Sequence, residues 1–262
     1  MIISVLLMPT IMAAREARHR RICTDNLRQI GQASALYLQD YDQTYLFAWG
    51  LDNTPNWHAV VAPYIKDARA AYLRHKRSHE SDLDDDWAAD QPVFHCPADT
   101  EEPAPVSYAT NALISGCGTP FNSVYDPPER LDDLDCPQQL IWVGETNKNW
   151  SRTQGFNDSI TDWVRPVLDL GYSKDDDRSV AFYHRWLKER DWTDLAAAAV
   201  DCPDGLYMCK YPAFRHARHG LRTGEANFLF VDGHVRAFTW GKLNVNNFFP
   251  HLTGSQMAQY GR

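Results

Sequence analysis

Three histidines and one aspartate in the last fifth of the chain carry the side chains that a metal site needs. His216 and His219 are three residues apart, and Asp232 and His234 stand on either side of Gly233. If the segments that carry them are adjacent, three imidazoles and a carboxylate converge, and a zinc ion with an open position could activate water there. In the alternative, His219 bonds a hairpin backbone, Asp232 serves its turn and His234 points to solvent. That alternative fits the spacing, which matches no named metal motif.

Cysteine offers a second possible chemistry. The chain has six cysteines, namely Cys23, Cys96, Cys117, Cys136, Cys202 and Cys209. Because no Cys-x-x-Cys pair is present, the pattern gives poor support to a zinc ribbon or a thioredoxin-like site. Dispersed cysteines in an exported chain favour disulfides, and buried thiols in a cytosolic protein are the alternative. Six cysteines allow about 15 pairings, and the most local one joins Cys202 to Cys209 across a Pro-Asp-Gly turn.

Motifs for other reactions do not occur in the sequence. There is no Gly-x-Ser-x-Gly elbow, phosphate loop or Gly-x-Gly-x-x-Gly. The 34 carboxylates include no pair that stands out for glycoside hydrolysis. Glu145, at the end of an apolar run, could be a ligand or a hydrogen-bond acceptor with a structural role. A net charge of −8 argues against nucleic-acid binding. The sequence therefore predicts a protein that is not an enzyme.

Two apolar segments that flank these residues predict a small sheet. Residues 226–238 alternate around Asp232-Gly233, a dipeptide that favours a two-residue hairpin turn because both positions tolerate positive φ. The run at 140–145 is typical of a buried strand, and its expected partner is the strand at 227–231. Helical spacing of Trp57, Val60, Val61 and Tyr64 predicts a short helix that packs on the N-terminal segment.

The N-terminal segment predicts one long helix. Residues 1–14 are almost wholly apolar, whereas a membrane-spanning helix needs about 20 such residues, so the segment looks like the end of a membrane helix. The alternative is a buried helix of a soluble protein. After the polar change at Arg15, apolar positions recur at Cys23, Leu27, Ile30, Tyr37 and Tyr41, which is one face of a helix. A helix from the start to about residue 40 would be roughly 60 Å long.

Several short motifs, in their order, resemble a known family. Along the stem they are Pro9, Ala14-Arg-Glu-Ala-Arg18, Cys23, Asn26-Leu-Arg-Gln-Ile-Gly31 and Tyr37-Leu-Gln-Asp-Tyr-Asp42. Downstream they are Trp57 with Pro63-Tyr64, Phe94-His-Cys-Pro-Ala-Asp99, Ser107-Tyr-Ala-Thr-Asn111, and Arg218-His219 followed by Ala226-Asn and Asp232-Gly-His-Val235. With these motifs the chain resembles the bacterial type II secretion pseudopilin G-like proteins, and among them the prepilin-type proteins named for a His-X9-Asp-Gly domain.

The chain departs from that family in two ways. The family opens with a basic leader and a Gly-(Phe/Met)-Thr-Leu-x-Glu processing site, and an alignment on Pro9 leads us to expect about a dozen mature residues and the leader before Met1. The spacing also differs, because 12 residues separate His219 from Asp232. We expect the extra residues to lengthen the loop at 220–225.

The resemblance implies an α+β, pilin-like fold, in which a long N-terminal helix packs on a small antiparallel β-sheet with an inserted helical or loop lobe. The expected division is a stem at 1–42, partly transmembrane, and a globular head at 43–262 with a variable insertion at about 148–212. Because Cys23 and Cys96 both lie on recurring motifs, the resemblance favours a bridge between them that pins the stem to the head. Cys117 with Cys136 is the pair that remains. The other motif positions are His219, Asp232 and Gly233.

The function that the resemblance implies is that of a structural pseudopilin-like subunit of a type II secretion or type IV pilus-like assembly. Its expected partners are copies of itself, other pilin-like subunits, the assembly machinery and the bacterial inner membrane, with the head in the periplasm or in an extracellular filament. Charged groups near Arg15 and Glu16 would set the register between subunits. The alternatives are a cell-surface carbohydrate- or ligand-binding module on a pilin-type anchor and a metal-dependent hydrolase. No cofactor is expected, and calcium or zinc would be the metal of the alternative site.

Overall fold

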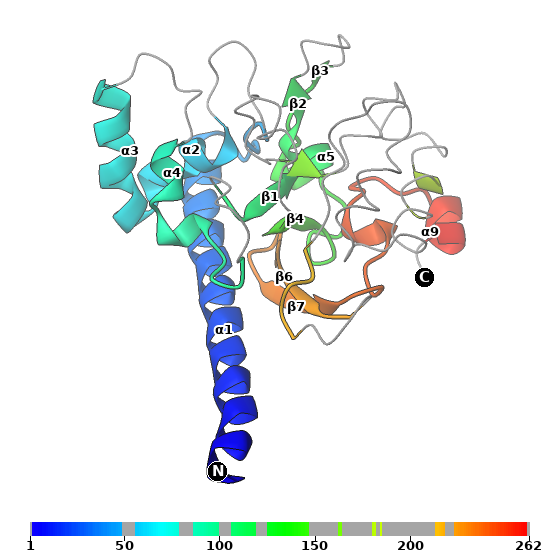
Figure 1. Ribbon diagram of the computed structural model, residues 1–262. Helices are drawn as coiled ribbons and strands as arrows, with labels where there is room; N and C mark the ends of the chain where they lie inside the picture. Colours follow the sequence, from blue (N-terminus) through cyan, green and yellow to red (C-terminus); the bar gives the residue numbers. More distant parts are fainter. Residues whose placement is uncertain are drawn as a thin grey trace, which may run out of the picture.

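The fold is α+β, with one long helix, a five-stranded sheet and several short helices around them. The computed structural model describes residues 2–48, 56–78, 86–99, 106–118, 125–146, 162–163, 180–181, 184, 213–217 and 223–260. Helix α1 (Ile2–Asp40) has 39 residues, so it is about 58 Å long at 1.5 Å per residue. Its first half extends beyond the rest of the molecule and its second half lies against the sheet (Figure 1). The predicted long helix is confirmed.

The second half of α1 buries one face. Cys23, Leu27, Ile30, Ser34 and Leu38 are buried at spacings of three or four residues, as the helical period requires. The predicted face continues to Tyr37, which packs against the core, and it was wrong only at Tyr41, beyond the end of α1. Tyr37 is only half-buried and Tyr41 is 54% exposed, and their rings stack with centroids 4.3 Å apart. Asp42 and Gln43 then adopt positive φ, which ends the helix and turns the chain back.

The sheet has the strand order β5-β1-β4-β6-β7. Strands β1 (Tyr108–Asn111), β4 (Ile141–Glu145), β6 (Glu225–Phe230) and β7 (Val235–Thr239) are antiparallel neighbours, whereas β5 (Asp162–Trp163) is parallel to β1 at the edge. The predicted pairing of the 140–145 strand with the 227–231 strand is confirmed as the β4–β6 ladder. A smaller sheet joins β2 (Cys117–Gly118) to β3 (Tyr125–Asp126).

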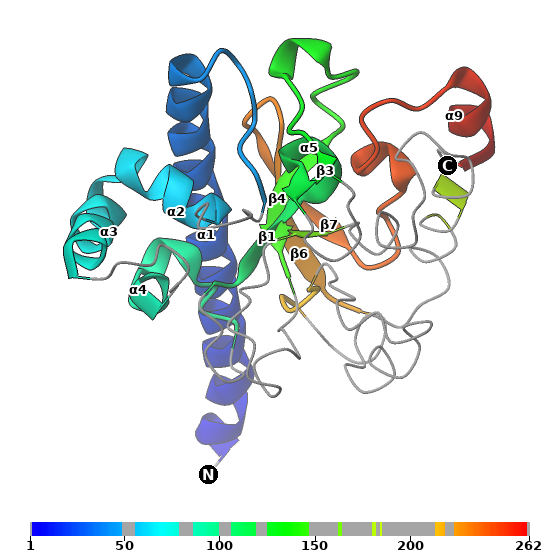
Figure 2. The ribbon, with the colours of Figure 1, turned by 90° about the horizontal axis from the view of Figure 1, so that it is seen from above.

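Both faces of the sheet are covered. On one face, α1, α2 (Trp57–Val61) and η1 (Ala62–Tyr64) bury a cluster that includes Trp57, Phe94 and Trp142. On the opposite face, Phe228 of β6 is buried in a cluster with Phe248 of the C-terminal segment, which contains η6 (Val245–Asn247) and α9 (Gly254–Tyr260). Figures 1 and 2 both show α1 to α4 on one side of the sheet and α9 on the other. The sheet is therefore the middle layer of the fold.

The remaining helices are short and follow from local signals. The predicted helix on the stem is confirmed by α2 and η1, and the Tyr64 hydroxyl donates to Asp40 Oδ2 at 2.8 Å. Next come α3 (Lys66–Ser78), α4 (Asp86–Ala89) and η2 (Pro92–Phe94). Between β1 and β4 lie α5 (Ala112–Ser115) and η3 (Leu131–Asp133). The Asn111 side chain caps α5 by accepting from the Leu113 N–H.

The predicted β6–β7 hairpin is confirmed, but its turn differs from the expectation. Only Gly233 has positive φ, at +88°, and Asp232 does not. The Gly233 N–H donates to the Phe230 carbonyl, and the Phe230 N–H donates to the His234 carbonyl, both at 2.9 Å. This is a three-residue loop of residues 231–233 with the glycine in the left-handed position, a common alternative to the two-residue turn.

Most of the expected insertion at 148–212 lies outside the described residues, as do Cys202 and Cys209. Within that stretch β5 extends the central sheet, and Val180 is buried in the cluster on the α9 face. The described helices include none with an apolar stretch long enough to cross a membrane.

A close approach between α1 and β6 gives a test of this packing. A Cβ on Gly31 would lie 2.8 Å from Leu229 Cδ1, and Leu229 is fully buried. Valine is a slightly better helix former than glycine, so the Gly31→Val change tests the packing alone. We expect it to lower the free energy of unfolding by about 1–3 kcal/mol, because an overfilled core must shift.

Chemical denaturation of wild type and Gly31→Val measures this change in the free energy of unfolding. Gln32→Val places the same side chain at an exposed position of the same helix, and we expect it to alter the free energy of unfolding by under about 0.5 kcal/mol. Equal stability of Gly31→Val and wild type would show that α1 and β6 are not packed this closely.

Candidate functional site

Four polar or sulfur-bearing side chains meet in the apolar layer between α1 and the sheet. Cys23 comes from α1, Cys96 follows η2, Glu145 ends β4, and His216 precedes β6. All four are buried, and one potential ligand atom from each lies within 4.8 Å of the others. We call this group the buried polar cluster. Side chains of these kinds are rarely buried together without a structural or chemical role.

Cys23 and Cys96 form a disulfide, as the resemblance implies, with Cα atoms 5.2 Å apart. The bond closes a loop between residues separated by 73 positions, which in the chain-entropy model stabilises the fold by about 4 kcal/mol. The Asn26 amide supports the same junction by donating to the Pro92 and His95 carbonyls at 2.9 and 2.8 Å. The stem is therefore fastened to the segment after η2 by a covalent bond and two hydrogen bonds.

The structure does not confirm the other two expected disulfides, Cys117–Cys136 and Cys202–Cys209. Cys136 carries a free thiol in an exposed turn, where its φ is +50°, so the predicted Cys117–Cys136 pair is wrong. Cys117 lies instead in β2, opposite Asp126 of β3. The predicted Cys202–Cys209 pair lies outside the described residues.

His216 is held from both sides of the stem–sheet interface. Its Nε2 lies 3.0 Å from Glu145 Oε1 and 3.5 Å from Cys96 Sγ. On the other side of the ring, Nδ1 lies 3.0 Å from Glu16 Oε1, which also accepts from the Ala217 N–H at 3.0 Å. The backbone of His216 forms a two-way bridge with Glu225 at the start of β6. One imidazole thus joins a carboxylate of α1 to a carboxylate of the sheet.

A β-bulge in β4 directs Glu145 into this interface. The β4–β6 register shifts between Ile141 and Val143, so that Ile141 packs on the α9 face and Val143 on the α1 face. Because alternate residues share a face, Glu145 then points to the α1 side with Val143. There Asn227 Nδ2 donates to Glu145 Oε1 at 2.7 Å, whereas Glu145 Oε2 is buried and bonds no described group.

A buried ion pair lies next to the cluster. Arg215 Nη1 is 2.8 Å from Asp99 Oδ2, and both side chains are almost fully buried. Arg215 also donates to the Thr146 carbonyl, and Asp99 accepts from the Ser107 hydroxyl at 2.9 Å. These contacts give the Cys-Pro-x-Asp motif and the serine of the Ser-Tyr-x-x-Asn motif a structural role, because they join the Cys96 segment to β1 and to His216.

The cluster shifts the titration of its own members. Burial disfavours the charged imidazole, but with Cys96 reduced the hydrogen bonds to Cys96 and Glu145 and the Glu145 charge outweigh it and raise the pKa of His216 to about 10. In the reduced protein burial alone would raise the pKa of the Cys96 thiol, yet hydrogen bonds from Cys23 and His216 and the Arg215 charge lower it to about 7. Burial and a hydrogen bond to Cys96 raise the pKa of the Cys23 thiol.

Three of the four expected metal-site residues are described by the structure, and of these three only His216 lies in the cluster. His216 lies at the start of β6, and Asp232 and His234 lie beyond its other end, roughly 20 Å along the strand. Asp232 Oδ1 accepts from the His234 N–H at 3.1 Å and lies 2.5 Å from its Nδ1, so this pair serves the turn at Gly233. His219 lies outside the described residues.

The resemblance paired Cys23 with Cys96, and sequence reasoning noted Glu145, but it did not connect Glu145 or His216 with that pair. It also missed Glu16 as an internal partner of His216. A usable signal existed, because Glu16 is the only acidic residue before Asp25 in a strongly basic segment. Arg215 and Asp99 were also missed as a pair. The pairs Glu16–His216 and Asp99–Arg215 each join residues more than 100 positions apart. Local sequence patterns do not indicate such contacts.

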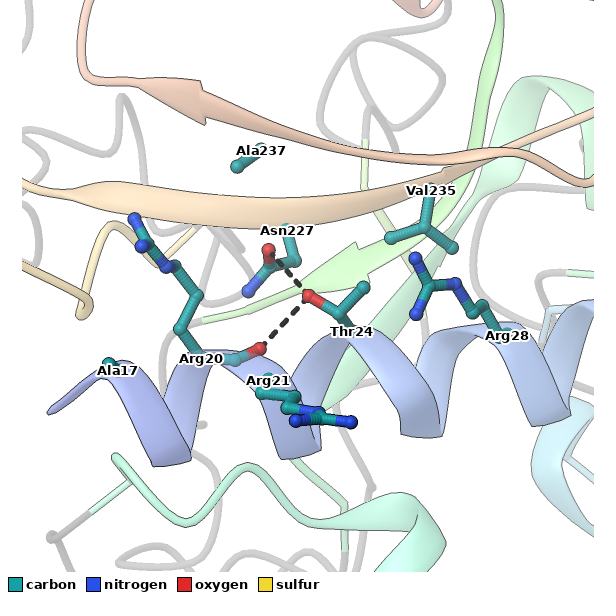
Figure 3. A pocket seen from close by; sticks show the side chains of 8 residues that line it. All are labelled: Ala17, Arg20, Arg21, Thr24, Arg28, Asn227, Val235 and Ala237. Carbon is teal, nitrogen blue, oxygen red and sulfur yellow. Dashed lines mark hydrogen bonds between the residues drawn. The ribbon is translucent and has the colours of Figure 1, made fainter. Parts of the chain in front are cut away.

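A cleft of about 370 Å³ lies between α1 and the hairpin, beside the cluster (Figure 3). Its basic side chains face carboxylates: Arg20 pairs with Glu225 at 2.5 Å, and Arg28 with Asp25 at 2.8 Å. Asn227 joins the cleft to the cluster, because its Oδ1 lies 3.2 Å from the Thr24 hydroxyl while its amide nitrogen bonds Glu145. The cleft therefore reaches within one side chain of Glu145.

Comparison with known proteins finds one family model that is similar to part of the chain. Residues 12–135 match the family model described as a protein of unknown function (DUF1559). The matched segment runs from the exposed part of α1 past η3 and contains Glu16, Cys23, Cys96 and Asp99, whereas Glu145 and His216 lie beyond it. No curated protein and no solved structure matches the chain.

The buried ion pair predicts a large effect of a single substitution. Asp99→Ala leaves the Arg215 charge buried without its carboxylate, and we expect it to lower the free energy of unfolding by about 3–5 kcal/mol. Asp133→Ala is the matched control, since it removes an exposed partner of Arg130 and should cost less than about 1 kcal/mol. Denaturation of both variants under oxidising conditions measures the two values. Similar losses would show that the Arg215–Asp99 pair is solvated.

The raised pKa of His216 predicts a pH dependence of stability. A histidine whose pKa is higher in the folded than in the unfolded state contributes stability that is complete below about pH 6.5 and is lost as the pH rises toward 10. We therefore expect the stability difference between wild type and His216→Gln, both with the Cys23–Cys96 bond reduced, to shrink across this window. Denaturation curves at several pH values measure it, and His234→Gln, at the exposed turn, is the control. A difference that stays constant with pH would contradict the charged state of His216.

Proposed function

We propose that the chain is a structural pilin-like subunit, a pseudopilin-like component of a type II secretion or type IV pilus-like assembly, and not an enzyme. The exposed apolar stretch of α1 carries this proposal. Met8, Ile11 and Met12 are 65%, 59% and 69% exposed, and they account for three of the seven large hydrophobic side chains exposed among the described residues. Their spacing of three and four residues places them on one helical face.

An apolar helical face in water is unfavourable, and burial against a matching surface stabilises it by about 25 cal/mol per Å². In a bundle of stems, copies of the same face supply that surface. The second half of α1 already packs one face on the sheet, so we assign assembly to the projecting half. This division of α1 into a packed half and a projecting half supports a subunit that assembles through its N-terminal helix.

Several further observations agree with the proposal. The match of residues 12–135 to DUF1559 begins inside the projecting half of α1 and continues into the body. The Cys23–Cys96 disulfide suits an oxidising compartment such as the periplasm or the cell exterior. We therefore place the head in the periplasm or in an extracellular filament, with the stem in the inner membrane or the filament core.

The contacts of Glu16 refine how neighbouring stems would align. Because Glu16 bonds His216 and Ala217 of its own chain, it is not the free charge that the sequence suggested for setting the register. Arg15 and Arg18 are exposed on the same turn of helix. They are the basic groups that an acidic surface of a neighbouring subunit would meet.

Substitution of the projecting apolar face tests assembly. With Ile11→Glu or Met12→Glu in the full chain, we expect self-association to weaken about tenfold or more, because a charge replaces a side chain whose burial is worth over 1.4 kcal/mol. Sedimentation velocity over a concentration series measures the association. Met257→Glu, at an exposed position of α9, is the matched control and should associate as wild type does. A chain that stays monomeric at all concentrations, or associates equally with Ile11→Glu, would refute the proposal.

A further inference from the structure

We infer that Cys23, Cys96, Glu145 and His216 form a Zn²⁺ site when the Cys23–Cys96 bond is reduced, so that the metal and the disulfide are alternative states of one buried cluster. This inference is independent of the assembly proposal, because it concerns the body of the protein and not the projecting half of α1.

The donor atoms suit zinc in type and number. Two thiolates, one imidazole nitrogen and one carboxylate oxygen make a four-ligand set, and zinc binds ligands of these kinds at about 2.0–2.3 Å. In a tetrahedral site such ligands are about 3.3–3.8 Å apart. The four candidate atoms already lie within 4.8 Å of one another, so reduction followed by small side-chain rotations could close the site. Calcium prefers oxygen ligands only, and a carboxylate is a poor ligand for Cu(I).

The surroundings of two ligands resemble the outer shell of a metal site. His216 directs Nε2 at the cluster, and its Nδ1 lies 3.0 Å from Glu16 Oε1. Metal-binding histidines typically donate their second ring N–H to such a carboxylate, which fixes the ring and its tautomer. Glu145 is likewise held by Asn227, at 2.7 Å. Glu16 and Asn227 are therefore positioning residues in this proposal.

The strongest sign of a ligand is the unused oxygen of Glu145. Glu145 Oε2 is buried and bonds no described group, although a buried carboxylate oxygen without a partner is costly. A disulfide alone gives no reason to keep a carboxylate there, because a disulfide needs neither a charge nor an acceptor. Zinc would bind that carboxylate and would offset the negative charges of the two thiolates.

The two states interconvert by balanced steps. An external dithiol reduces the disulfide by giving it two electrons and two protons, and is itself oxidised to a disulfide. Zinc then binds the two cysteine sulfurs and displaces their two protons. Oxidation by an external disulfide reverses the sequence and releases the ion. The cleft lined by Thr24 and Asn227 (Figure 3) would supply a route, since Asn227 also bonds Glu145.

Zinc titration of the full chain in two redox states tests the inference. The reduced protein, prepared with a non-chelating phosphine, is titrated with Zn²⁺ in competition with a chromophoric chelator, beside the oxidised protein. Because reduction frees other thiols as well, the comparison that matters is with Cys23→Ser, which should lose one equivalent of bound Zn²⁺. Cys136→Ser, which removes an exposed free thiol, should retain that equivalent. Co²⁺ in place of Zn²⁺ should show the thiolate charge-transfer and d–d bands of a tetrahedral site.

If Cys23→Ser folds poorly, two further variants test the zinc site without replacing a cysteine. Glu145→Gln preserves size and should abolish the carboxylate ligand, while Glu16→Gln leaves all four ligands in place and should weaken Zn²⁺ binding about tenfold. His234→Gln is the histidine control and should bind as wild type does. The inference is overturned if reduced wild type binds no more Zn²⁺ than the oxidised protein. It also fails if Glu145→Gln and Glu16→Gln bind as tightly as wild type.

Discussion

The burial of Glu145 at the interface between α1 and the sheet constrains the rest of the structure. A carboxylate in an apolar layer must find donors, and here His216 and Asn227 supply them. Because the same imidazole also reaches Glu16, the rotation of α1 and its position along the sheet are both fixed. Apolar packing alone would tolerate small slips of the helix, whereas this chain of hydrogen bonds would break.

The bulge in β4 is the local feature that makes this arrangement possible. Without it, Glu145 would share a face with Ile141 and would lie under the C-terminal segment, away from Cys23. One extra residue in β4 therefore decides whether the Glu145 carboxylate lies on the α1 side or on the α9 side of the sheet. The close approach of α1 to β6 at Gly31 has the same dependence on register, since a shift of β6 by one residue would move Leu229 to the other face.

Local patterns in the sequence predicted the elements, and long-range geometry decided the site. The period of Cys23, Leu27 and Ile30 was enough for α1, and the alternation around Asp232-Gly233 was enough for the hairpin. The same reasoning grouped His216 with Asp232 and His234 because they are near in sequence, but β6 holds them at opposite ends. Neither the bulge nor the 200-residue separation of Glu16 from His216 leaves a periodic trace. Sequence reasoning therefore did not join Glu145 and His216 to the Cys23–Cys96 pair.

The position of the cluster along α1 matters as much as its chemistry. Glu16 and Cys23 are seven residues apart, about 10 Å along the helix. They follow the exposed residues 8–15 of α1, and Cys23 is the first of the described α1 residues to be fully buried. When a force bends the projecting half of α1, the contacts at the place where the helix leaves the body bear most of the load. There the chain has placed a disulfide, the Glu16–His216 contact and the Arg20–Glu225 ion pair. The residues that carry the most unusual chemistry thus also hold the stem rigid relative to the sheet.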